Sequence, residues 1–155
     1  VDYPTGAEEH EIVNRARRAA VEPQMVLSID DVLRLQAAAR AVEVDPSVQD
    51  YAVRLVLATR DPKAFGLQID GMLSYGASPR ASIGLIHAGR AIALVRGRDH
   101  LLPQDIYDVA YDVLNHRLVL SFDAVADDVT VDDVLDHLLP EDWREDYSDD
   151  EELLR

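Results

Sequence analysis

Apolar side chains recur at helical spacing along most of this chain, and the stretches begin at residues that cap helices. Thr5 and Glu8 have the spacing of a capping box, so a first helix is predicted from Thr5 to about Ala20. Pro23 prevents its easy continuation, and a second helix is predicted to begin at Ser28. The predicted inward face of this second helix consists of Val32, Leu35, Ala39 and Val42.

Prolines at first helical positions mark the next helices. A third helix is predicted after residues 45–46, an aspartate followed by a proline, and it ends before the glycine-containing loop 61–77. A fourth helix is predicted from Pro79 to about Arg96, because Gly97 occupies the position where helices commonly end. Its small residues, on which another helix could pack closely, are Ala81, Gly84, Ala88 and Ala91.

The last third of the chain predicts two more helices and one short strand. A fifth helix begins at Pro103, and weak alternation at 118–122 is compatible with a strand. Thr130 caps the final helix. The inward residues of these two helices are Ile106, Val109, Ala110, Val113 and Leu114, then Val131, Val134, Leu135, Leu138 and Leu139. The predicted fold class is therefore all-α, a compact bundle of five to six helices.

Composition supports one helical domain over residues 1–139. Hydrophobic residues make up 48% of the 155 positions and aromatic residues only 6%, which favours closely packed helices over a β-sandwich. Residues 140–155 contain too little apolar surface to offset their ordering entropy, so we expect a flexible tail. The absence of cysteine fits a reducing cytoplasm, and no apolar run is long enough to span a membrane.

Negative charge is concentrated near the C-terminal end. The formal charge is −15, and residues 121–155 contain 14 acidic residues against Arg144 and Arg155. Residues 1–120 are nearly balanced, with 16 acidic and 13 basic residues. Nucleic acid is therefore a poor partner, because phosphate binding needs a basic face.

Catalytic and metal-binding patterns are missing. The only lysine, Lys63, does not belong to a phosphate-binding loop, and the glycines at 66 and 71 are followed by Met72 where such a loop has lysine. The acidic pairs at 127–128 and 132–133 suit the start of the last helix better than a calcium site. No metal-site spacing joins the histidines, which are His10, His87, His100, His116 and His137. We expect no catalytic residue and no metal ligand in this chain.

The segment from Gly76 to Ala81 contains an electrostatic exception. Ser78 and Pro79 predict a helix start with a capping hydroxyl, yet Arg80 places a cation in the first turn. The helix dipole disfavours a cation there, unless an anion binds between the free N–H groups and the guanidinium. Ser78, Pro79 and Arg80 could thus form half of a phosphate site, while an exposed arginine or one paired with a nearby acid is the alternative.

The same segment carries a family resemblance. The stretch GASPRAS, followed by GRAIALVRGRDHLLPQDIYDVAYDVLNHRLVLSF, resembles the C-terminal lid domain of MoxR-type AAA+ ATPases. The opening VDYPTGAEE is similar to that family's linker from the nucleotide-binding core, so residues 1–4 would be linker and the resemblance covers about 1–139. Most other matched positions are interpreted as architectural: Arg90, Gly97, Arg98, Asp99, Pro103, Asp105, His116 and Arg117. Leu102 departs from the family, which usually has a capping Thr or Ser there.

The resemblance implies a nucleotide-dependent role. Arg80 would be the sensor 2 arginine that contacts the γ-phosphate of ATP, with Ser78 and Pro79 beside it and Tyr3 near the adenine. The phosphate loop, the magnesium-binding acid and the arginine finger of the family are not in this sequence, so we expect a lid fragment that is no enzyme alone. The chain also begins without methionine, as a piece of a longer protein would.

The implied partners are protein domains. They are the AAA+ core of the same protein, neighbouring subunits of a ring and a protein with a von Willebrand factor A domain, with ATP and Mg²⁺ bound by the core. The full protein would be a cytoplasmic chaperone that remodels or activates a client. A stand-alone acidic adaptor, docking through its tail and last helix, is the alternative function. A helix-turn-helix DNA binder is disfavoured by the charge.

Overall fold

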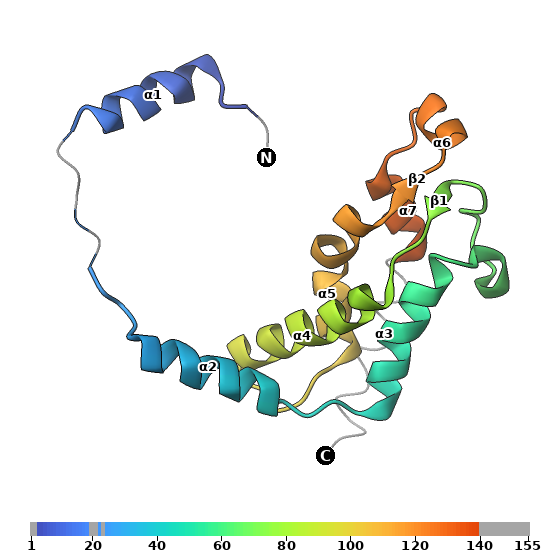
Figure 1. The fold of residues 1–155 in the computed structure, drawn as a ribbon, viewed down its shortest axis with the longest axis horizontal. Coiled ribbons are helices and arrows are strands. Elements are labelled where there is room, and N and C mark those ends of the chain that lie inside the picture. The colour runs from blue at the N-terminus through green and yellow to red at the C-terminus, as the bar shows by residue number, and fades with distance from the viewer. Residues whose placement is uncertain (1–2, 19–21, 23, 140–155) are drawn as a thin grey trace. The chain divides into compact units, whose positions relative to one another are not determined.

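The computed structural model describes residues 3–18, 22 and 24–139, and it divides the chain into two units. The first unit comprises Val1–Leu33 and the second Arg34–Arg155. Each unit is mostly helical, as the colour-graded ribbon of Figure 1 shows. The expected tail at 140–155 lies outside the described residues, and the domain boundaries drawn from the sequence stay predictions.

The first unit contains α1 (Gly6–Ala16) and the beginning of α2 (Ile29–Ala41). The predicted capping box is confirmed, because the Thr5 N–H donates to Glu8 Oε2 at 2.7 Å and the Glu8 N–H donates to Thr5 Oγ1 at 3.4 Å. The helix ends at Ala16, earlier than predicted.

The predicted inward face of α2 is wrong at its two largest residues. Val32 is 42% exposed and Leu35 is 49% exposed, although Val42, just after the helix, is buried. Neither α1 nor α2 contains a buried residue. An apolar stripe predicts a helix, but it does not say where the surface that covers it lies.

The second unit contains the rest of the helices and a small sheet. Its elements are α3 (Pro46–Ala58), η1 (Pro62–Phe65), β1 (Leu73–Tyr75), α4 (Pro79–Val95), α5 (Pro103–Leu114), η2 (Asn115–Arg117), β2 (Val119–Leu120), α6 (Phe122–Ala126) and α7 (Val131–Leu138). The all-α fold class is confirmed, with seven α-helices in the described part of the chain where five to six were expected. The short strand near 118–122 is confirmed, and its antiparallel partner β1 was missed.

Local stop and start signals explain where these helices begin and end. The Asp45 carboxylate accepts from the Ser47 N–H at 2.8 Å, and Thr130 accepts from the Asp133 N–H at 3.2 Å. Gly97 has φ = 76°, the left-handed conformation that ends α4 and that residues with a Cβ adopt at a cost. These three predictions are confirmed.

Close packing of α4 on α5 forms the centre of the core. The buried residues of α4 are Ala81, Leu85, Gly89 and Ala93. In the predicted small-residue stripe Gly84 and Ala88 are partly buried and Gly84 faces Val113 of α5, so the prediction is wrong only at Ala91, which is exposed, and it missed Gly89. A Cβ at Gly89 would lie 2.8 Å from Leu101 Cδ1 and 3.1 Å from Ile106 Cδ1. The missing side chain at Gly89 therefore lets the two helices approach.

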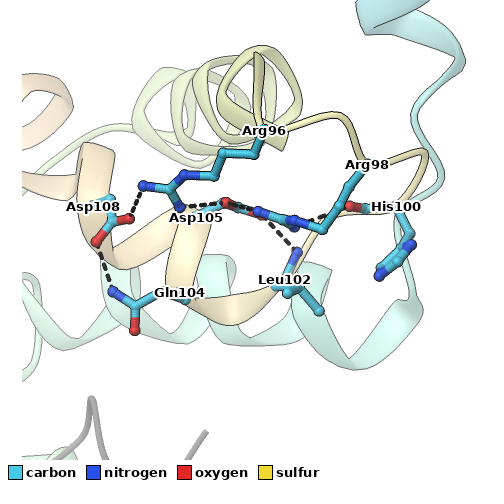
Figure 2. Close-up of polar contacts among 7 residues, drawn as sticks. All are labelled: Arg96, Arg98, His100, Leu102, Gln104, Asp105 and Asp108. Atoms are coloured by element: carbon cyan, nitrogen blue, oxygen red, sulfur yellow. Dashed lines mark hydrogen bonds and ion pairs between the residues drawn. The ribbon is translucent and has the colours of Figure 1, made fainter. Parts of the chain in front are cut away.

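Asp105 ties the end of α4 to the start of α5 (Figure 2). Its carboxylate is fully buried and receives two hydrogen bonds from Arg98, at 2.6 and 2.7 Å, and one from Arg96, at 2.8 Å. The Leu102 N–H donates to the same carboxylate at 3.0 Å. Asp105 thus supplies half of a capping box where the family's Thr or Ser is absent.

Opposing effects set the pKa of Asp105. Burial raises the pKa of this carboxyl, because it disfavours the charged form. Hydrogen bonds from Arg98 and from the Leu102 N–H lower the pKa, helped by the charge of Arg98, and they outweigh burial. The folded-state pKa therefore lies below the usual 3.8.

Replacing Asp105 by asparagine should leave two arginines facing a neutral group in the core. We expect Asp105→Asn to lower the free energy of unfolding by about 3–5 kcal/mol, measured by chemical denaturation. Asp108→Asn removes the partly exposed partner of Arg96 and should cost only about 0–1 kcal/mol. Equal effects of the two substitutions would contradict a buried, central role for Asp105.

Acidic pH should weaken the contacts that Asp105 makes with Arg96 and Arg98. A carboxyl whose pKa is lower in the folded state contributes stability above its unfolded pKa, near 3.8, and loses it as the pH falls through the folded pKa. Unfolding measured from pH 7 to pH 2.5 should therefore show a stability difference between wild type and Asp105→Asn that shrinks below about pH 4. A difference that grows on acidification would contradict the lowered pKa.

Candidate functional site

The candidate site lies at the start of α4, where Ser78, Pro79 and Arg80 follow one another. Ser78 is the N-cap residue and Pro79 occupies the first helical position, as predicted. The predicted capping hydrogen bond is wrong: the Ser78 side chain makes none, and the Ala81 N–H instead donates to the Ser78 backbone oxygen at 2.8 Å. The Ser78 hydroxyl is therefore not used by the helix end.

The last turn of α3 and the residues after it fix the direction in which α4 begins. The Ala77 N–H donates to Thr59 Oγ1 at 2.9 Å, and Arg60 Nε donates to the Ala77 backbone oxygen at 2.7 Å. Thr59 is itself buried, and its hydroxyl donates to the Val56 backbone oxygen at 2.7 Å. Both polar backbone groups of Ala77 are thus held one residue before the N-cap.

Gly76 allows this approach. A Cβ at position 76 would lie 2.6 Å from the Thr59 carbonyl carbon and closer still to its oxygen, so no side chain fits there. Sequence reasoning missed Thr59 and Arg60, because they are 17 to 18 residues away from Ala77 along the chain. The available signal was Gly76 itself, which precedes the cap in the resemblance motif.

The Arg80 side chain lies at the surface of its unit. It is exposed, and within the part of the chain that the structure describes it has no hydrogen bond or ion pair. Pairing with a nearby acid, the alternative left open by the sequence, is therefore not found among the described residues. An unpaired guanidinium beside a free hydroxyl at a helix N-terminus is suited to bind a phosphate group.

Tyr3 belongs to the first unit and is 98% exposed. The structure therefore brings Ser78, Pro79 and Arg80 together on one element, and the role of Tyr3 at the adenine stays a prediction. No group of three or more potential metal-ligating side chains occurs in the described ranges, and none of the helices in them is long and apolar enough to cross a bilayer.

The close packing at Gly76 can be tested by a substitution that adds one methyl group. Gly76→Ala should lower the free energy of unfolding by about 1–3 kcal/mol, because the clash is with the backbone of Thr59, which cannot move easily. Gly84→Ala is the control. The added Cβ would lie 3.1 Å from the Val113 Cγ1 methyl, which can shift, so the loss in the free energy of unfolding should be smaller. Chemical denaturation of the two variants compares them, and a larger loss in Gly84→Ala would contradict the tight junction.

Comparisons with known proteins show what this part of the chain is similar to. Residues 68–138, which include the start of α4 and the whole α4–α5 pair, match the AAA lid domain family. Chaperone MoxR1 of Mycobacterium tuberculosis is 45% identical over 140 residues, which cover 90% of this chain and 37% of that protein. Protein MoxR of Paracoccus denitrificans is 37% identical over 81 residues, which cover 49% of this chain and 24% of that protein.

A solved structure from Cytophaga hutchinsonii, named a "putative ATPase", superposes with a TM-score of 0.78 and 34% identity. The match covers 90% of this chain and 43% of that one. The chain thus spans well under half the length of these relatives. Residues 68–138 form an AAA lid domain, and the chain is a relative of the MoxR chaperones.

Proposed function

We propose that this chain acts as the nucleotide-responsive lid of an ATP-hydrolysing MoxR-type chaperone, with Arg80 as its sensor for the γ-phosphate. The observation that carries the proposal is the exposed guanidinium of Arg80, which has no hydrogen bond or ion pair with any described residue, at a helix start whose direction is fixed by Thr59 and Arg60. The bound nucleotide would supply a dense negative charge at this helix end. Arg80 would gain a charge-assisted partner only when the γ-phosphate is present.

Such a contact gives the lid a nucleotide-dependent position. An arginine that binds the γ-phosphate stabilises lid orientations in which the two groups can meet, by as much free energy as the contact supplies. Since Ala77 and Gly76 hold the start of α4 against the end of α3, displacement of Arg80 would move these helices together rather than bend the loop alone. Arg80 thereby orients the lid, and chemistry at the γ-phosphate would be done by residues outside this sequence.

The rest of the proposal concerns the longer protein. ATP and Mg²⁺ would be bound mainly by an AAA+ core domain, with Tyr3 close to the adenine, and the protein would work in the cytoplasm as a ring. A partner with a von Willebrand factor A domain and a client protein would complete the system. The name of the Mycobacterium tuberculosis relative supports the chaperone class.

The alternative of a stand-alone acidic adaptor receives less support. It needs the last helix as a docking surface, yet the apolar side of α7 is used inside the unit. Val134, Leu135 and Leu138 are all buried. The charged side of α7 would therefore have to bind a partner without an apolar contact.

Removal of the Arg80 guanidinium should weaken nucleotide use in the complete protein. We expect Arg80→Ala to reduce ATP turnover by about 10–100-fold, because a charge-assisted hydrogen bond contributes about 1.5–3 kcal/mol. Arg54→Ala, which removes another exposed arginine of the second unit, should leave turnover unchanged. Steady-state ATPase assays measure both variants. Unchanged turnover together with unchanged ATP affinity in Arg80→Ala would contradict the proposal.

A further inference from the structure

Arg117, at the end of η2, contains a buried nitrogen without a partner. Its Nε atom is inaccessible to solvent and makes no hydrogen bond with any described residue. Only Arg90 Nε shares this state among the described side chains that are not exposed. Buried polar atoms are nearly always hydrogen-bonded, and an exception commonly marks a group whose partner is not in the structure.

No ion pair joins Arg117 to the acidic side chains of α7 in the described part of the chain. Helix α7 contacts η2, and its sequence contains several aspartates. Asp132, however, accepts a hydrogen bond from Asn115 Nδ2 at 3.3 Å, and Asp136 accepts one from the Tyr111 hydroxyl. Both carboxylates thus contact neutral donors, and Arg117 has no acidic partner among the described residues.

Two features place Arg117 at the same end of the unit as Arg80. Strand β2 begins at Val119, two residues after Arg117, and Val119 pairs with Tyr75, the last residue of β1. Because the pairing is antiparallel, the chain after Tyr75 and the chain before Val119 leave the same end of the ribbon. The chain after Tyr75 leads within three residues to the N-cap Ser78.

The packing of α4 on α5 gives the same placement independently. Gly84, in the second turn of α4, faces Val113, near the end of α5. Further along α4, Gly89 faces Leu101 and Ile106, which lie just before and near the start of α5, so the helices run antiparallel. The start of α4 therefore lies level with the residues that follow α5, which are those of η2. In Figure 1 a short extended segment leads from β1 to the start of α4, and β2 lies beside β1.

We propose that Arg117 is a second cationic contact for the phosphates of the nucleotide, beside Arg80. This inference rests on the proposed nucleotide site and adds a residue to it. Two guanidinium groups that flank one helix N-terminus neutralise more of the charge of a triphosphate than one, and their fixed donor geometry suits phosphate oxygens. Because Arg117 Nε is inaccessible to solvent, the terminal guanidinium nitrogens of Arg117 would donate to the phosphate oxygens.

Arg90 provides a matched control. It is the other arginine with an orphaned Nε, and it lies on the same helix as Arg80. It is ten residues further along α4, which corresponds to about 15 Å. A purely structural effect of removing a half-buried arginine should appear at both positions, whereas a phosphate contact should appear only at Arg117.

The test uses the complete protein with its nucleotide-binding core. Equilibrium binding of ATP and of ADP is measured by titration calorimetry for wild type, Arg80→Gln, Arg117→Gln and Arg90→Gln, with melting temperatures recorded for each. We expect Arg117→Gln to bind ATP about tenfold more weakly, with a smaller loss for ADP and a reduced dependence on salt. Arg90→Gln should bind both nucleotides like wild type. If Arg117→Gln does not fold, Arg117→Met takes its place in the same binding measurement, because methionine keeps the apolar part of the side chain.

The outcomes separate this inference from the proposed function. If Arg80→Gln weakens ATP binding and Arg117→Gln and Arg117→Met do not, Arg117 is no phosphate contact, while the sensor role of Arg80 stands. If none of the three affects ATP binding, Arg117 is no phosphate contact, and the sensor role of Arg80 is wrong as well if Arg80→Gln also leaves ATP turnover unchanged. Arg117→Gln and Arg90→Gln could also lose ATP affinity equally, in step with lowered melting temperatures. That result would overturn the inference, because it would indicate a structural effect.

Discussion

The site depends on one connection, the capture of the Ala77 backbone by the end of α3. Thr59 Oγ1 accepts from the Ala77 N–H, and Arg60 Nε donates to the Ala77 oxygen, so neither polar group is free to rotate away. Gly76 makes the capture possible by leaving no Cβ against the Thr59 carbonyl. Because α4 begins two residues later, its direction and the outward position of Arg80 follow from this connection.

The far end of α4 is fixed in a different way. Asp105 is buried at the start of α5 and holds Arg96 and Arg98, which lie at and just beyond the end of α4. Between the two connections, Gly89 brings α4 against α5 without a gap. A helix held at both ends and along its length moves as a rigid element, so a force on Arg80 would be transmitted to the α4–α5 pair as a whole.

Elements whose ends are set locally could be predicted from the sequence. The Asp45 cap, the left-handed Gly97 and the Thr130 cap act within four residues, and their helices begin and end where expected. The all-helical fold class and the short strand near residue 120 also follow from local pattern. Helix α6, by contrast, has only five residues, and β1 has three, too few for a periodic signal.

Features that need a distant partner could not be predicted. The Thr59 and Arg60 contacts with Ala77 span 17 to 18 residues, and no spacing rule identifies them. The small-residue stripe of α4 was predicted correctly at Ala81, Gly84 and Ala88 but not at Ala91, and it missed Gly89, because small residues occur on several faces and only the position of α5 selects among them. Arg80 was found by its departure from the dipole rule, and its family role came from resemblance, which physics alone did not supply.

The most direct measurement is a structure of the complete protein with a non-hydrolysable ATP analogue. The account predicts that a guanidinium nitrogen of Arg80 lies about 2.7–2.9 Å from an oxygen of the γ-phosphate, with Ala77 still bound to Thr59 and Arg60. A structure in which nucleotide is bound and Arg80 pairs with a carboxylate of its own unit, away from every phosphate oxygen, would contradict it.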